Sequence, residues 1–198
     1  MDAIRELKTR AEILHRRIQA NDHHAIGRLC VLPEFRRASY EHLTAAIGTI
    51  RRRDCLTVIA AELGFASWPD AKTAISGDGP IADFGTILYS GHGCAAHLNR
   101  WYKTYEEAAA DRTESGGYLL AYKRQYLVVD HYFIQSLGLD PADPDWEALG
   151  FDWVRPKSLA ARSRLYGQLV AGLPRAPISS APLSRSVLRL VRQDAKRS

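Results

Sequence analysis

The stretch Ser90-Gly91-His92-Gly93-Cys94-Ala95-Ala96-His97 contains the residue types of a nucleophilic active site. It lies between a predicted strand (84–89) and a predicted long helix that begins at residue 98 and ends at the glycines 116–117. A glycine-rich loop in that position leaves backbone N–H groups free to bind an anion. A thiol at such a helix start has a lowered pKa, and a nearby histidine can accept its proton. The pattern predicts a hydrolase or transferase with Cys94 as nucleophile and His92 and His97 as bases.

The same residues also fit a purely structural role. Cys94 is three and four positions from His97 and Leu98, so it can begin the apolar stripe of the helix, and free cysteine is among the most often buried residues. No partner acid is visible at a fixed spacing. His92, Cys94 and His97 do not have the spacing of a zinc pair, and a fourth ligand is not identifiable. We therefore predict no metal and no cofactor, and we favour a protein that is not an enzyme.

Basic residues at three places suggest nucleic acid as an alternative ligand. They are Arg51, Arg52 and Arg53 before a predicted helix pair, Lys123 and Arg124 between two tyrosines, and Arg189 and Arg192 near the C-terminus. Basic side chains neutralise phosphate, and tyrosines can stack on bases. However, the helix pair places Trp68 and Pro69 where a recognition helix usually presents polar side chains to base edges.

Charge is distributed unevenly along the chain. The net charge of +5 combines +3 over residues 1–76, −7 over 77–154 and +9 over 155–198. A basic C-terminal segment either binds nucleic acid or acidic lipid, or folds back onto the acidic middle of the same chain. Both interpretations stay open, although charge runs are most often solvated.

The first part of the chain reads as helical. Ile4, Leu7, Ala11, Leu14 and Ile18 alternate at steps of three and four, which predicts one amphipathic helix ending near residue 21. A short helix is predicted over 22–29. A helix pair follows, in which Gly64 ends the first helix and Ser67 caps the second, with Trp68-Pro69-Asp70 in its first turn.

Residues 58–68, Val-Ile-Ala-Ala-Glu-Leu-Gly-Phe-Ala-Ser-Trp, together with Lys72 resemble a small helical module of uncharacterised bacterial proteins. In those proteins the module commonly precedes ankyrin repeats or glyoxalase-like domains. The resemblance implies a bacterial origin and a helical N-terminal module. It transfers no catalytic residue, because neither ankyrin repeats nor a glyoxalase metal site is recognisable in the rest of the chain.

Turn-forming residues at 75–80 separate this part from a region with a different pattern. After the strand and the long helix described above, two strands are predicted within 118–129, joined at 123–125, and helices are predicted over 131–137, 144–149 and 159–170. A Pro/Ser-rich linker (172–186) and a short helix (187–191) follow. The predicted fold is α+β: a helical module (1–76), a small domain with about three strands packed with helices (82–171), and a partly disordered basic tail (172–198).

Location and partner follow from what the composition lacks. No apolar run approaches the ~18 residues that span a bilayer, the start of the chain has no secretory apolar region, and three cysteines at wide spacings suit a reducing compartment. We predict a cytoplasmic, non-catalytic binding protein. Its predicted partner is an unidentified protein or a small anionic ligand, with nucleic acid as the alternative; a membrane is not predicted, and the oligomeric state is left open.

Overall fold

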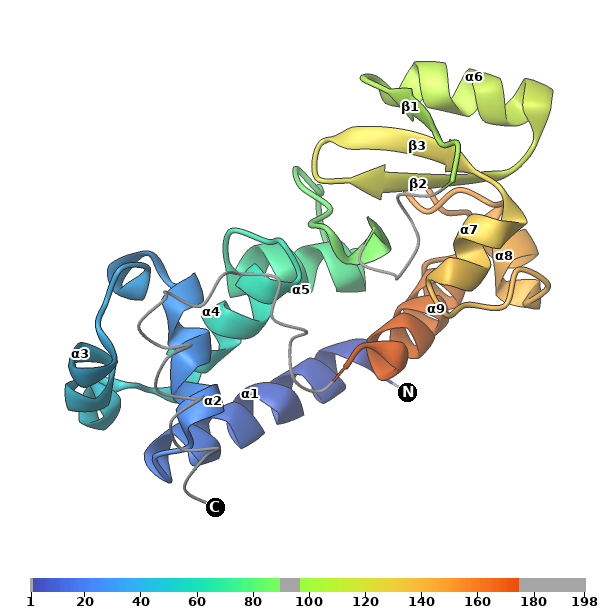
Figure 1. The fold of residues 1–198 in the computed structure, drawn as a ribbon. Coiled ribbons are helices and arrows are strands. Elements are labelled where there is room, and N and C mark those ends of the chain that lie inside the picture. The colour runs from blue at the N-terminus through green and yellow to red at the C-terminus, as the bar shows by residue number, and fades with distance from the viewer. Residues whose placement is uncertain (1, 90–96, 175–198) are drawn as a thin grey trace. The chain divides into compact units, whose positions relative to one another are not determined.

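The computed structural model describes residues 2–89 and 97–174, and it confirms the α+β class (Figure 1). The helices and strands in chain order are α1 (Ala3–Gln19), α2 (His23–Gly27), η1 (Arg28–Val31), η2 (Pro33–Phe35), α3 (Tyr40–Ala45), η3 (Ile47–Thr49), α4 (Arg52–Glu62), α5 (Trp68–Ser76), η4 (Ile87–Tyr89), β1 (Arg100–Tyr102), α6 (Tyr105–Ser115), β2 (Tyr118–Tyr122), β3 (Gln125–Val129), α7 (His131–Ser136), α8 (Pro144–Leu149) and α9 (Leu159–Gly172), where η marks a 3-10 helix. The predicted linker began at residue 172, but Gly172 is the last residue of α9; the rest of the linker from residue 175 and the helix predicted over 187–191 lie outside the described residues.

The chain forms two compact units. Residues 7–62 make up most of one unit, and residues 63–173 together with the first residues of the chain make up the other. Each unit is described here by itself.

The unit of residues 7–62 is entirely helical. Leu7, Ala11, Leu14 and Ile18 of α1 are buried, as their spacing predicted. Asp22 caps α2 by accepting a hydrogen bond from the N–H of Ala25. The guanidinium of Arg28 donates two hydrogen bonds, of 2.8 and 2.7 Å, to the carboxylate of Glu62 and so ties η1 to the end of α4. This unit is therefore held by one apolar helix face and a well-matched, largely buried ion pair.

The second unit is built on a three-stranded antiparallel sheet in the order β1-β3-β2. The hairpin predicted within 118–129 is confirmed, with Lys123 at φ +52° in its turn. The strand predicted over 84–89 is wrong. Gly85 has a φ of +66° there, which is incompatible with a strand, and its carbonyl accepts the N–H of Lys123 at 2.7 Å, so the segment closes the hairpin turn. The third strand is β1.

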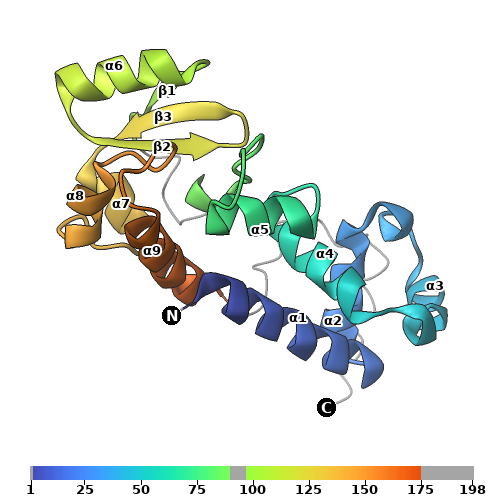
Figure 2. The ribbon, with the colours of Figure 1, turned by 180° about the vertical axis from the view of Figure 1, so that it is seen from behind.

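Helix α6 covers one face of the sheet, which both views show (Figure 1, Figure 2). Ala108 of α6 packs with Leu119 and Val128 in a buried cluster. The helix begins later than predicted, because Thr104 and Glu107 form a reciprocal capping box. Trp101 and Tyr102 belong to strand β1 and not to the helix. The predicted start of this helix at residue 98 is therefore wrong.

Helices α7 and α8 lie on the opposite side of the sheet (Figure 1, Figure 2). The predicted helices in this region are confirmed, with Asp130, Asp143 and Ser158 as N-caps. Between α7 and α8, the carboxylate of Asp140 accepts the N–H of Ala142 within a turn.

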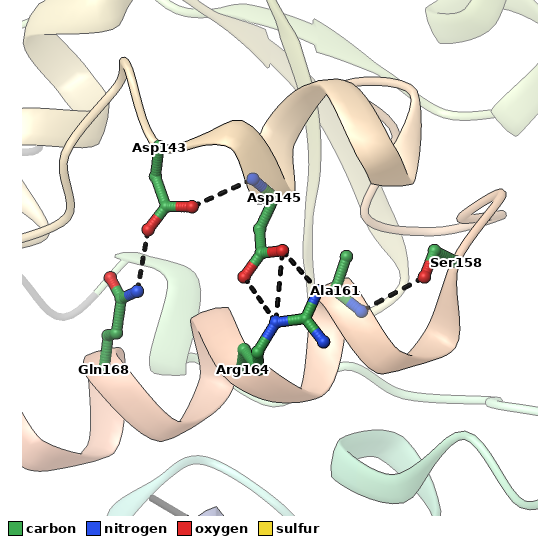
Figure 3. A network of polar contacts seen from close by, with 6 residues as sticks. All are labelled: Asp143, Asp145, Ser158, Ala161, Arg164 and Gln168. Carbon is green, nitrogen blue, oxygen red and sulfur yellow. Dashed lines mark hydrogen bonds and ion pairs between the residues drawn. The ribbon is translucent and has the colours of Figure 1, made fainter.

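Polar contacts tie α8 to α9 (Figure 3). Arg164 donates to the carboxylate of Asp145 at 2.9 Å, and the amide of Gln168 donates to Asp143 at 2.8 Å. The hydrogen bonds from Gln168 and from the N–H of Asp145 lower the pKa of Asp143. Asp143 and Asp145 are thus used by neighbouring groups of the same unit.

None of the helices within residues 2–89 and 97–174 has the length and apolarity needed to cross a bilayer.

Candidate ligand-binding surface on the sheet

Two of the three predicted catalytic residues, His92 and Cys94, lie outside the described residues, so the Cys94 nucleophile stays a prediction. His97 is described: its half-buried imidazole packs edge-on against Phe133, with 5.9 Å between ring centroids. Among the described residues, no three His, Cys, Asp or Glu side chains are grouped to hold a metal ion.

The described cysteines do not have the properties of nucleophiles. Cys30 and Cys55 are free thiols. Burial raises the pKa of the Cys30 thiol, and burial together with the nearby Asp54 raises the pKa of Cys55 to about 11. Both thiols are protonated at neutral pH, which is the opposite of what a cysteine nucleophile requires.

The arginines before α4 are partly matched by acids. Arg51 donates to the carbonyl of Gly48, while Arg52 and Arg53 lie 3.9 and 3.7 Å from the carboxylates of Glu12 and Asp54. These pairs are solvent-exposed and contribute little to stability, but they reduce the local positive charge. Arg189 and Arg192 lie outside the described residues.

An aromatic cluster lies on the face of the sheet opposite α6. Tyr89 of η4 contacts three other rings: Trp101 and Tyr122 at 5.4 Å and Phe133 at 5.7 Å between centroids. Trp101 and Tyr122 also meet each other edge to face at 5.9 Å. The strand register explains the grouping, since Trp101 pairs with Leu127 and Leu127 pairs with Leu120, which is two positions from Tyr122 on the same face.

The cluster is anchored on one side and open on the other. Phe133 is fully buried, and Tyr89 and Tyr122 are half-buried. Trp101 is 41% exposed. Its neighbours therefore fix the position of an indole ring whose remaining surface is in contact with water.

Three basic residues lie at the adjoining end of the sheet. Lys123 and Arg124 form the β2–β3 turn, and Lys103 follows β1 at the same end, because Tyr102 pairs with Tyr126 just after the turn. All three are exposed, and within residues 2–89 and 97–174 none of them forms an ion pair. We call these three residues and the rings of Tyr89, Trp101 and Tyr122 the tip surface.

Acidic residues near the tip surface are few. Asp83 is close to it, because the next residues, Phe84 and Gly85, hydrogen-bond to the backbone of Lys123; its carboxylate accepts the N–H of Gly85 at 2.8 Å. Glu106 pairs with Arg155, and Glu107 belongs to the capping box. A net positive charge therefore remains beside the exposed indole.

Tyr126, which sequence reasoning placed with Tyr122, lies on the other face of the sheet. Its ring packs against Tyr105, whose hydroxyl donates to Asp152 at 2.6 Å and whose face is covered by the guanidinium of Arg155 at 3.7 Å. Burial, together with the hydrogen bond to Asp152, raises the pKa of Tyr105 to about 12. Tyr126 is thus part of the packing under α6 and is not available to a ligand.

Comparison with protein-family models, curated proteins and solved structures finds no match for this chain. The resemblance of residues 58–72 to a bacterial helical module therefore stays a prediction.

Proposed function

We propose that the protein is a non-catalytic binding protein whose tip surface binds single-stranded nucleic acid. The observation that carries the proposal is the exposed Trp101, held by Tyr89 and Tyr122, beside three basic side chains that have no acid partner among the described residues. Bases stack on such rings regardless of sequence, and cations beside them contact the backbone phosphates. The expected binding is therefore weakly sequence-dependent and sensitive to salt.

The residues of the tip surface favour binding over catalysis. Its titratable groups are lysine, arginine and tyrosine, and within residues 2–89 and 97–174 none has a partner arranged to take or give a proton. Removing one stacking ring from such a surface costs about 1–3 kcal/mol, which corresponds to a roughly 5- to 150-fold loss of affinity. We also propose a reducing, cytoplasmic location, in agreement with the free thiols of Cys30 and Cys55.

The test measures binding of the full-length protein to labelled single-stranded oligonucleotides by fluorescence anisotropy. The oligonucleotides are about 12 nucleotides long, which is within the usual site size. Trp101→Ala should weaken binding by roughly 5- to 150-fold. Tyr132→Ala is the matched control, because Tyr132 is an exposed aromatic residue of the same unit (58% exposed) outside the tip surface; it should leave the affinity unchanged.

A second pair of variants separates the sheet from the basic tail. Lys123→Gln with Arg124→Gln removes two charges of the tip surface, and Arg189→Gln with Arg192→Gln removes two charges of the tail. Loss of binding only in the tail variant would assign the ligand to the tail and refute the proposal. Absence of any binding to single strands, with capture of a protein instead, would return the function to protein interaction.

A further inference from the structure

Arg162 of α9 is buried to an extent that is unusual for arginine. Its side chain is 1% exposed, and one of its nitrogens, Nη1, donates to the carbonyl of Trp153 at 3.2 Å. The other two, Nε and Nη2, have no acceptor in the part of the chain that the structure describes. These two atoms form the edge of a guanidinium that binds anions with two parallel hydrogen bonds.

Two further buried polar atoms lie beside this guanidinium. Trp153 Nε1 and the hydroxyl of Tyr166 are also buried, and among the described residues neither has a hydrogen-bond partner outside this pair. Tyr166 follows Arg162 by one helical turn, and its ring meets that of Trp153 at 4.7 Å between centroids. Arginine and tryptophan can only donate hydrogen bonds. The cluster therefore has an excess of donors.

No carboxylate of the described residues balances the charge of Arg162. Asp152, the acid next to Trp153, already accepts the hydroxyl of Tyr105 and the N–H groups of Val154 and Arg155. Burial lowers the pKa of Arg162, and only the neighbouring Tyr166 acts in the opposite direction. An unpaired buried charge is costly, and arginine avoids the cost less readily than other cations because it does not deprotonate in proteins.

The end of α5 provides partial compensation. Gly77 caps this helix, and a Cβ at Gly77 would overlap with Nη2 of Arg162. The C-terminal end of a helix carries roughly half a negative charge. The helix end therefore offsets only part of the arginine charge.

We propose that Arg162 Nε and Nη2, together with the Tyr166 hydroxyl, bind a compact monovalent anion of the size of a halide or formate. The surroundings limit the size and charge of the ligand. Trp153, whose carbonyl accepts from Arg162, and Leu165 and Leu169 of α9 are buried apolar residues, and they offer no further cation to balance a phosphate or sulfate. The bound ion would complete the packing of α5, α9 and residues 151–157.

The experiment measures thermal unfolding of the full-length protein in sodium chloride, bromide or formate against sodium gluconate at equal ionic strength. Gluconate is much larger than a halide or formate and controls for general salt effects. Above saturation, the melting midpoint should rise by roughly 3–6 °C for each tenfold increase in halide. In gluconate the midpoint should not show this rise.

Arg162→Met should abolish the halide response, and Arg164→Met should keep it, because Arg164 is an exposed arginine of the same helix. If Arg162→Met does not fold, Tyr166→Phe serves in its place and should weaken the response. Anomalous diffraction from bromide-soaked crystals then locates the ion. Equal midpoints in halide and gluconate, or only ordered water at Nε and Nη2, would overturn the proposal.

Discussion

Replacing Gly64 by alanine should destabilise the unit of residues 63–173 through two separate effects. Gly64 has a φ of +82°, a left-handed conformation that costs an L-residue about 1–2 kcal/mol. An added Cβ would also lie 2.5 Å from the side chain of Thr86 and 2.7 Å from its backbone nitrogen. That nitrogen donates to the carbonyl of Leu63 at 2.8 Å.

The contact with Thr86 has two costs. Moving Thr86 away weakens a hydrogen bond with a net value of about 1 kcal/mol, and strain in a packed region adds about 1 kcal/mol or more. With the conformational cost, the expected loss for Gly64→Ala is about 3–4 kcal/mol. For a chain of this length, that loss lowers the melting midpoint by roughly 6–16 °C.

Two other glycines isolate the contributions. Gly138 has a φ of +76° but no atom within 4 Å of an added Cβ, so Gly138→Ala should show the conformational cost alone. Gly172 lies in α9 with no positive φ and open space around it, so Gly172→Ala should be neutral or slightly stabilising.

Urea unfolding followed by tryptophan fluorescence is the appropriate assay. Trp68, Trp101, Trp146 and Trp153 all lie in the unit of residues 63–173, so the signal reports that unit. If Gly64→Ala and Gly138→Ala lost the same free energy of unfolding, the steric contact with Thr86 would be irrelevant and the reasoning refuted.

Three further predictions follow from buried or capped groups. Cys55, with its pKa raised to about 11, should react with iodoacetamide far more slowly at pH 8 than a solvent-exposed cysteine does. Rapid labelling of Cys55, seen by peptide mass spectrometry, would contradict its burial. The raised pKa of Tyr105, about 12 against a usual value near 10, stabilises the fold fully below pH ~10, and this contribution is lost as the pH rises through ~12. Wild type should therefore lose more stability over this range than Tyr105→Phe does, as measured by urea unfolding. Thr104→Ala removes the capping box of α6 and should cost about 1 kcal/mol, read from the same urea curves, whereas Thr113→Ala within the helix should be nearly neutral.

Local sequence signals predicted much of the secondary structure. The cap Ser67 and the left-handed Gly64 were identified, because caps and helix ends depend on interactions within a few residues. The same kind of signal was available for α6. Thr104-x-x-Glu107 is the pattern of a capping box, and it places the helix start after Trp101.

Features that depend on distant residues could not be predicted in this way. Trp101 belongs to the tip surface because β1 pairs with β3 and because η4 brings Tyr89 beneath it. Similarly, Arg162 appears in the sequence as one of several arginines in a basic segment. Its burial results from contacts with Trp153 and Gly77, which are far from it or on other elements.

The average charge of a segment is a poor guide to its surface. Residues 77–154 have a net charge of −7, which argued against nucleic acid. In the structure, several of these acids are engaged locally: Asp111 with Arg100, Asp145 with Arg164, and Glu107 in a helix cap. The unmatched cations of this region include those at the tip.

The salt dependence of binding tests this distribution directly. For single strands, the logarithm of the affinity falls with that of the salt concentration by about 0.7 for each phosphate contacted. Contacts from the three basic residues of the tip surface alone give a slope near −2. Further contacts from Arg51–Arg53 and from the tail residues Arg189 and Arg192 would make the slope roughly −5 to −6. We expect a slope near −2 in the wild type. In the Lys123→Gln, Arg124→Gln variant the magnitude of the slope should decrease by about 1.4. A slope near zero in the wild type would mean that the tip surface does not contact phosphate, and stacking on Trp101 would then have to be explained by an uncharged ligand.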